Sequence, residues 1–178
     1  MDVTQIPPGA NPPHEMNAFI EIPQGGLPVK YELDKASGAL FVDRFLHTSM
    51  IYPVNYGFVP NSLAEDGDPL DILVVAPTPV VPGSVICARP IGVLLMSDEK
   101  GFDEKVLSVP VDRLNPFYKD VKFHTDLPPL LIDQITHFFT HYKDLEPGKN
   151  ASVGEWAGLD VAHERIRLAI ERYNRGGA

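Results

Sequence analysis

Basic residues are scarce in this sequence. Its 178 residues include 15 lysine and arginine residues against 24 aspartate and glutamate residues, which gives a formal net charge of −9. A protein that binds nucleic acid through the phosphate backbone needs a positive surface, because much of the affinity comes from counterion release. The acidic balance therefore argues against nucleic acid as a partner.

Cysteine and long hydrophobic runs are also scarce. Cys87 is the only cysteine, so no disulfide can form within the chain, and its apolar neighbours predict a buried small side chain. No apolar stretch approaches the roughly 20 residues that span a bilayer, and the N-terminus lacks the pattern of a signal peptide. We therefore expect a cytoplasmic protein that does not associate with membranes.

What remains is the composition of an ordinary globular protein, 44% hydrophobic and 22% charged. The length suits one domain with a hydrophobic core. Eighteen prolines are scattered along the chain, which indicates many turns between short strands. We predict a single domain over residues 1–178, with residues 1–14 as an irregular N-terminal segment.

The first half of the chain predicts short β-strands. Residues 18–22 and 28–33 alternate apolar and polar side chains around a glycine pair, which predicts a hairpin. Such a hairpin would place Glu21 near Lys30 and Glu32 on one polar face, and the residues alone favour a solvated face with a cross-strand ion pair. Further strands are predicted at residues 39–46, 71–77, 84–96 and 106–111. Residues 84–96 would form one long bent strand or two short ones.

The last third of the chain predicts two helices. Residues 127–145 and 158–174 carry apolar side chains at helical spacing, and Asp126 before the prolines is a candidate N-cap for the first helix. Strands followed by helices are typical of the α+β class. We predict a small OB-like β-barrel of mostly antiparallel strands with the two C-terminal helices packed outside.

Two acidic turns stand out against this background. The stretch EDGDPLD, residues 65–71, holds Asp66, Asp68 and Asp71 in six residues, where like charges repel unless something positive lies between them. A plain surface turn is an equally good interpretation of this stretch alone, but Asp71 begins a strand predicted to be buried. A second acidic turn, SDEKGFDEK, also separates two apolar strands.

The second turn places Asp98 and Asp103 five residues apart, as Asp66 and Asp71 are. Two such turns at one end of a barrel would form a cage of carboxylate oxygens, which suits Mg²⁺ or Mn²⁺ better than zinc. The chain does not match an EF-hand loop, which would need glycine where Asp71 lies and glutamate where Pro77 lies.

Several cationic and phenolic side chains accompany the acidic turns. Each taken singly is more often structural. Together with a carboxylate cage they indicate a phosphate-rich anion as ligand; they are Lys30, Arg44, Lys105, Lys143, Tyr52, Tyr56 and Tyr142.

These motifs resemble those of the family I inorganic pyrophosphatases of bacterial type. The run D-G-D-P-L-D at residues 66–71 is highly specific, and EIP…KYE, GALFVDRF, YPVNYGF and HYKDLE match as well. The resemblance implies hydrolysis of pyrophosphate to two orthophosphates by a metal-activated hydroxide. It also implies several Mg²⁺ ions per active site, with Mn²⁺ as a possible substitute, and pyrophosphate and phosphate as the small-molecule partners.

The resemblance further implies a role for each site residue. Asp68 would be the general base, and Tyr56 would support catalysis and substrate binding. The metal ligands would be Asp66, Asp71, Asp103, Asp98, Glu21 and Glu32, and the other substrate-binding groups Lys30, Arg44, Lys105, Tyr142 and Lys143. This reverses the interpretation of Glu21 and Glu32 as part of a solvated face.

The resemblance also implies a homo-hexamer in which His137 and His141 lie at a subunit contact, so that acid would loosen the assembly by charging them. Two other functions remain open from the residues: an OB-like barrel that binds an oligonucleotide or a protein, and a Mg²⁺-dependent phosphatase of other phosphate esters.

Overall fold

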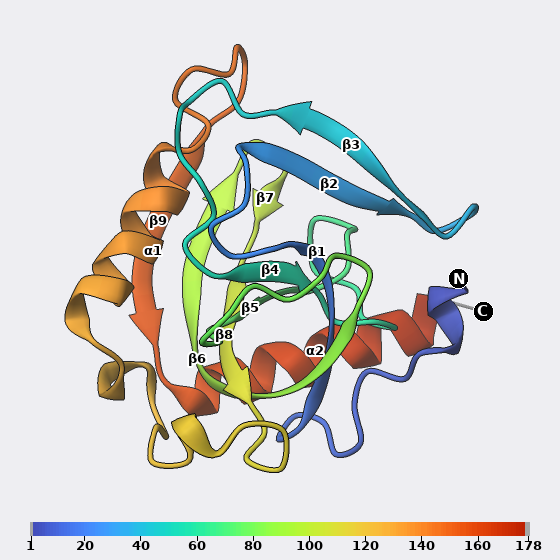
Figure 1. Ribbon diagram of the computed structural model, residues 1–178. Coiled ribbons are helices and arrows are strands. Elements are labelled where there is room, and N and C mark those ends of the chain that lie inside the picture. The colour runs from blue at the N-terminus through green and yellow to red at the C-terminus, as the bar shows by residue number, and fades with distance from the viewer. Residues whose placement is uncertain (1, 177–178) are drawn as a thin grey trace.

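The structure, a computed structural model, describes residues 2–176 and belongs to the α+β class (Figure 1). Two α-helices, α1 (Pro129–His141) and α2 (Leu159–Gly176), accompany short 3₁₀ helices at Val3–Gln5, Pro116–Tyr118 and His124–Asp126. β2 (Val29–Asp34) and β3 (Ala39–Phe45) form a two-stranded sheet of their own. The larger sheet contains β1 (Met16–Ile22), β4 (Asn55–Phe58), β5 (Asp71–Val74), β6 (Val85–Asp98), β7 (Gly101–Phe102), β8 (Lys105–Pro110) and β9 (Ala151–Ala157).

The pairings of the larger sheet return to their starting strand. Its order is β1-β4-β5-β8-β6-β7, β9 pairs with β6, and β1 also pairs with β6. Five strands therefore form a closed ring, in which only β5 and β8 run parallel. The stretch predicted as one long bent strand or two short ones is the single strand β6, with a register shift between Pro90 and Gly92.

The predicted hairpin between residues 18–22 and 28–33 is wrong. β1 pairs with β4 and β6, whereas β2 pairs with β3. Nearly every residue of β1 is buried, so its backbone N–H and C=O groups need strand partners along both edges, whereas β2 is largely half-buried or exposed. β9 was not predicted, because Gly154 and Glu155 interrupt its apolar pattern.

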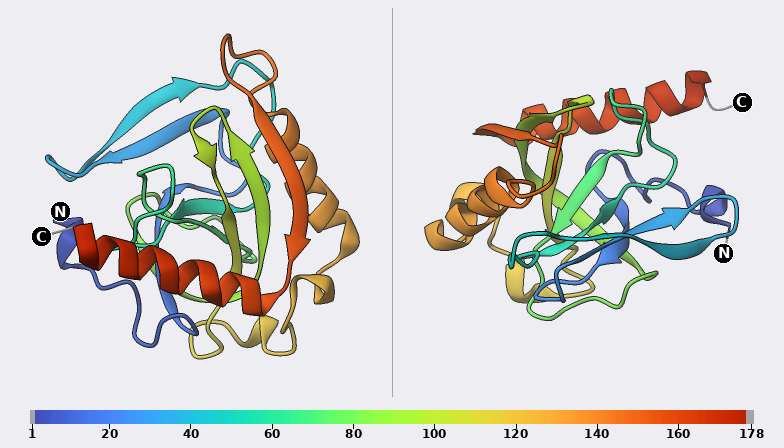
Figure 2. Two further views of the ribbon diagram at one scale, coloured as in Figure 1. Left: turned by 180° about the vertical axis from the view of Figure 1, so that it is seen from behind. Right: turned by 90° about the horizontal axis from the view of Figure 1, so that it is seen from above.

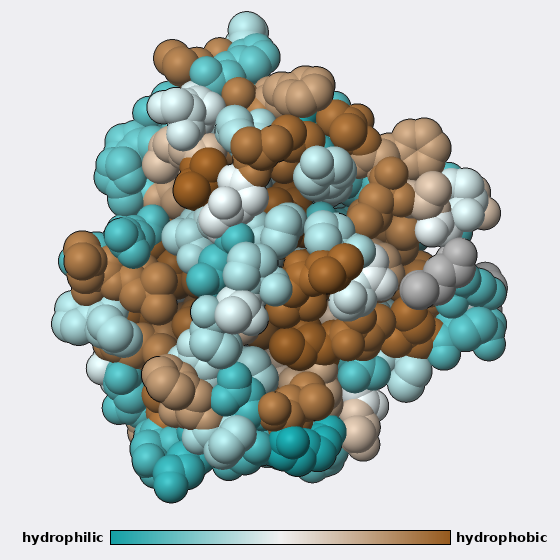
Figure 3. Space-filling view, viewed as in Figure 1, coloured by the Kyte–Doolittle hydropathy of each residue, from teal (hydrophilic) through white to brown (hydrophobic). Residues whose placement is uncertain are grey.

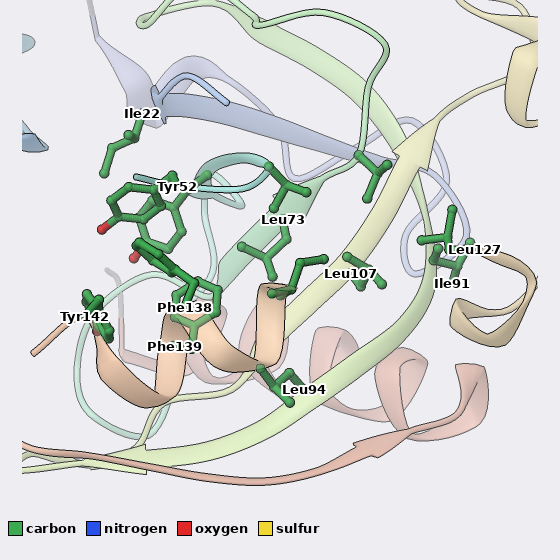
Figure 4. Packing of buried hydrophobic residues seen from close by; sticks show 14 of the residues in the cluster. Ile22, Tyr52, Leu73, Ile91, Leu94, Leu107, Leu127, Phe138, Phe139 and Tyr142 are labelled. Carbon is green, nitrogen blue, oxygen red and sulfur yellow. The ribbon is translucent and has the colours of Figure 1, made fainter. Parts of the chain in front are cut away.

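Both predicted helices are present, but the cap assigned to the first is wrong. α1 follows Pro128, and the Asp126 carboxylate instead accepts the amides of Lys122 and Phe123 within the preceding 3₁₀ turn. α1 buries Ile135, Phe138 and Phe139. These side chains pack against a cluster that includes Tyr52, Leu73 and Leu107 from the strands and loops (Figure 4).

The second helix packs on a different part of the ring. Ala162, Ile166 and Ala169 of α2 are buried in a cluster with one residue each from the end of the first acidic turn, from β5 and from β8, namely Leu70, Ile72 and Val106. Figure 2 shows α2 crossing the back of the molecule. The strands that follow the acidic turns are thus held in place by buried apolar contacts.

The surface carries hydrophilic and hydrophobic residues side by side (Figure 3). Phe41, Val42 and Phe45 of β3 are among the exposed large hydrophobic side chains. Cys87 is only half-buried, contrary to expectation, and its sulfur accepts a hydrogen bond from Arg113 at 3.0 Å. Within residues 2–176, neither helix combines the length and apolar character needed to cross a membrane.

Candidate active site

A cavity of about 320 Å³ opens between the two-stranded sheet, the two acidic turns and the C-terminal end of α1. Every side chain that the sequence singled out for catalysis, metal or substrate lines it. The acidic members are Glu21, Glu32, Asp66, Asp68, Asp71, Asp98 and Asp103, and the others are Lys30, Arg44, Tyr56, Lys105, Tyr142 and Lys143.

The centre of the cavity wall is a buried group of one lysine and two aspartates. β5 and β8 run parallel with Asp71 opposite Lys105, so the first residues of both strands meet. The Lys105 side chain is only 2% exposed, and its ammonium donates to Asp71 and Asp103. Burial acts to lower the pKa of Lys105, but the two carboxylates outweigh it and raise this pKa above its ordinary value.

The charged form of Asp71 is disfavoured even with Lys105 beside it. Burial raises the pKa of the Asp71 carboxyl to about 6, although Lys105 acts in the opposite direction. The Tyr56 hydroxyl donates to the same carboxylate at 2.8 Å. Tyr56 therefore contacts Asp71, one of the carboxylates that the family resemblance implies as metal ligands.

Local hydrogen bonds shape the first acidic turn. Gly67 has φ +90°, a conformation that side chains other than glycine rarely adopt. The Asp66 carboxylate accepts the Asp68 amide at 3.0 Å, and the Ala64 amide donates to the Asp68 carbonyl at 2.7 Å. This folding leaves the Asp68 side chain more than half exposed at the cavity, 2.9 Å from the Lys100 ammonium.

The second acidic turn is tied to α1. The Lys143 ammonium lies 2.8 Å from Asp98 and 3.1 Å from Glu99, and the Lys100 amide donates to Asp98 at 2.8 Å. Burial acts to raise the pKa of Asp98, but these hydrogen bonds outweigh it and lower that pKa. Asp98 is therefore ionised, with Lys143 as its partner.

The β2–β3 sheet supplies the opposite wall. Lys30 contacts Glu32 and lies 3.5 Å from Asp43, while Arg44 donates to Glu146 at 2.9 Å. These side chains face the cavity, so the interpretation of a merely solvated face is not supported.

Glu21 on β1 completes this wall. Its carboxylate is buried and accepts the Leu33 amide at 2.7 Å. Burial raises the pKa of Glu21 to about 8. Lys30 acts in the opposite direction on this pKa, but less strongly than burial does.

The stability of the metal-free protein should depend on pH through Glu21. Its pKa is about 8 in the folded protein against the ordinary 4.5. The folded state therefore binds more protons between these values, and stability is lost as the pH rises. We expect the midpoint temperature of thermal unfolding, measured in excess chelator, to decrease as the pH is raised from about 5 to about 8. Glu21→Gln keeps an acceptor for the Leu33 amide but cannot ionise, so its midpoint should fall less. Equal slopes in the two proteins would contradict this.

Residues 18–174 match the family described as inorganic pyrophosphatase. The inorganic pyrophosphatase of Caulobacter vibrioides is 63% identical over 174 residues, which cover 98% of each chain. This chain belongs to the inorganic pyrophosphatase family. The inorganic pyrophosphatase of Aquifex pyrophilus is 53% identical over 177 residues, 99% of each chain. The crystal structure of inorganic pyrophosphatase from Thermus thermophilus has a TM-score of 0.92 at 40% identity, and covers 98% of this chain and 99% of that one.

The enzyme is thus an inorganic diphosphatase, and the resemblance to family I of bacterial type is confirmed. Sequence reasoning missed Lys100, which faces Asp68, and also Lys35 and Lys149 at the cavity. Lys100 could have been found, since it lies inside the second acidic turn. Among the described residues, no three His, Cys, Asp or Glu side chains form a group that could hold a metal ion in the present arrangement, in which the Lys105 ammonium contacts both Asp71 and Asp103.

Proposed function

We propose that this pyrophosphatase depends on Mg²⁺ and uses Asp68 as the general base for attack by water. The observation that supports this most directly is the gathering of nine carboxylates with lysine, arginine and tyrosine side chains around one cavity. Pyrophosphate is itself strongly anionic, so carboxylates alone would repel it. A cavity of this composition becomes an anion site only when divalent cations reverse its local charge.

The side chains present fit magnesium in their chemistry. All the candidate donors are carboxylate oxygens, which hard divalent cations prefer. The raised pKa values of Glu21 and Asp71 reflect burial together with neighbouring negative charge. A bound cation would lower the pKa of both carboxyl groups. We assign Asp66, Asp71 and Asp103 as ligands, with Asp98, Glu21 and Glu32 for further ions. Mn²⁺ has the same ligand preference and is expected to substitute.

If Asp71 and Asp103 are to hold a divalent cation, Lys105 would have to give up its position. Its ammonium contacts both carboxylates and supplies the positive charge there. We propose that the Lys105 ammonium turns toward a substrate phosphate when the metals bind. When bound, Mg²⁺ would lower the pKa of a water and neutralise charge on the phosphates.

Asp68 is the carboxylate best suited to accept a proton from the attacking water. It faces the cavity, more than half exposed, and in the part of the chain that the structure describes its carboxylate pairs only with Lys100. A carboxylate without tight ligand duties can approach the water directly. Tyr56 holds Asp71 through its hydroxyl at 2.8 Å, which supports the metal ligand and leaves the phenol near substrate.

The cationic and phenolic groups would hold the two phosphates. We assign this role, with Tyr56, to a set drawn from β2, β3, β8 and the end of α1: Lys30, Arg44, Lys105, Tyr142 and Lys143. Fixed positive groups stabilise the charge that develops on the leaving phosphate without reorganising during the reaction.

We further propose the type of barrel, the extent of the domain, the location of the enzyme and its assembly. The closed ring of five strands is an OB-like barrel, residues 1–178 act as one domain, and the enzyme works in the cytoplasm. It assembles as a homo-hexamer with His137 and His141 near a subunit contact, and the exposed Phe41 and Phe45 are of the kind that interfaces cover. Sedimentation at neutral pH should give a hexamer, and a monomer would refute the assembly.

A phosphate-release assay tests the proposed function. Pyrophosphate, a nucleoside triphosphate and a sugar phosphate are each supplied with Mg²⁺ or with excess chelator. We expect rapid release from pyrophosphate with Mg²⁺ and none with chelator. Equal activity on the esters would favour a general phosphatase, and binding without turnover would favour a non-catalytic barrel.

A further inference from the structure

Two glutamates lie behind the acidic turns and face away from the active site. Glu65 precedes Asp66, and Glu104 lies between Asp103 and Lys105. Asp103 and Lys105 line the active-site cavity, whereas Glu104 lines a small hollow on the far side, as expected where successive side chains alternate. Glu65 lines the same hollow. Each turn therefore has carboxylates directed at the site and one carboxylate directed at the helix behind it.

Helix α2 meets each of these glutamates with an arginine. Arg165 Nε lies 3.2 Å from Glu104 Oε1, as an ion pair without an aligned hydrogen bond. Arg172 lies two turns further along the helix and hence on the same side. It donates to the Leu63 carbonyl at 2.6 Å and lies 3.5 Å from Glu65.

The backbone makes the same connection. The Leu63 amide donates to the Ala169 carbonyl of α2 at 3.0 Å, and Ala169 and Ile166 are buried with Leu70 at the end of the first turn. Both arginines and both glutamates line one hollow between α2 and the two turns. Figure 2, left, shows α2 in front of the strands.

We propose that Arg165 and Arg172 are positioning residues that set the separation of the metal-binding carboxylates. Arg165 holds the second acidic turn through Glu104, and Arg172 holds the first through Leu63 and Glu65. α2 is the common support, so the two arginines fix Asp66 relative to Asp103. This rests on the proposed roles of those two aspartates as ligands.

The chemistry of arginine suits this task. Its planar guanidinium offers several donors in a fixed arrangement, so Arg172 can serve a carbonyl and a carboxylate at once. Groups that orient metal ligands without contacting the metal typically change metal affinity by about 10–100-fold when removed. Turnover depends on them less once the metal sites are saturated.

The test measures Mn²⁺ binding to the full-length enzyme without substrate. Electron paramagnetic resonance monitors the concentration of the free ion. The double variant Arg165→Met, Arg172→Met keeps the aliphatic stems and removes both charges. We expect Mn²⁺ binding to weaken by about 10-fold or more, while kcat at saturating Mg²⁺ stays close to that of the wild type. When Arg172→Lys replaces Arg172→Met, part of the Mn²⁺ affinity should be recovered, because an ammonium can still bind the Leu63 carbonyl.

Arg175→Met is the matched control. Arg175 lies on the same helix but, within residues 2–176, pairs only with Glu171, one turn away, so its loss should leave Mn²⁺ affinity unchanged. Glu104→Gln removes the acidic partner of the Arg165 ion pair. This variant provides the test if the double variant does not fold. It should weaken binding in the same direction as Arg165→Met, and combining the two should add little.

The outcomes separate this inference from the proposed function. Asp66→Asn and Asp103→Asn should weaken Mn²⁺ binding severely; unchanged binding would refute their assignment as ligands. If they weaken binding while the folded arginine variants and Glu104→Gln bind as the wild type does, the positioning role alone is overturned. It is also overturned if Arg175→Met weakens binding as much as the other arginine variants do.

Discussion

Replacing Asp68 with asparagine should lower the rate of pyrophosphate hydrolysis by about 10²–10⁴-fold, the usual effect of losing a general base. Asparagine has the same shape but cannot accept the proton that the attacking water releases. The substitution should leave the fold intact, since the Asp68 side chain is more than half exposed and its carboxylate pairs with no described side chain other than Lys100. The measurement is steady-state phosphate release at saturating Mg²⁺, together with the Mn²⁺ affinity.

Lys100→Gln is the control for this variant, because Asp68→Asn also removes the ion pair with Lys100. Both partners of that pair are exposed, so its loss should change the free energy of unfolding by no more than about 1 kcal/mol and the rate only modestly. Turnover near wild type in Asp68→Asn, with metal binding unchanged, would show that Asp68 is not the base.

The second large effect is expected from Lys105→Met. This substitution leaves Asp71 and Asp103 buried beside each other without a cation. Removing one partner of a buried ion pair typically destabilises a protein by about 3–5 kcal/mol. We expect a loss of this size in urea unfolding with excess chelator, and a lower rate because a phosphate-binding group is missing. Mg²⁺ should recover much of the stability, since it binds the same carboxylates in the folded state.

Lys100→Met supplies the comparison for stability, because it removes a lysine from an exposed pair in the same cavity. It should cost about 1 kcal/mol or less under both conditions. If Lys105→Met is as stable as the wild type in chelator, or if Mg²⁺ stabilises both proteins equally, the ammonium does not stand in for a metal.

The sequence was most informative about local features. The apolar run after Asp71 predicts the buried strand β5, and the acidic turns on either side of apolar strands predict a shared site. Both follow from short-range patterns, which depend on residues near one another in the chain. The structure places the predicted site residues around one cavity.

Strand pairing was harder to predict. β1 finds its partners in β4 and β6 because its buried residues need cover on both sides, which cannot be read from the glycine pair that follows it. Whether Lys100 pairs with Asp68 likewise depends on how two turns 32 residues apart face each other. The support of both turns by α2 has the same origin, since Arg172 and Leu63 are 109 residues apart.

Binding of a non-hydrolysable pyrophosphate analogue, followed by titration calorimetry, tests the charge reversal at this site most directly. With Mg²⁺ present, we expect tight binding, because the bound cations and the lysine and arginine side chains together attract the anion. In excess chelator the carboxylates repel the analogue, and binding should become too weak to detect. Tight binding in chelator would contradict the account.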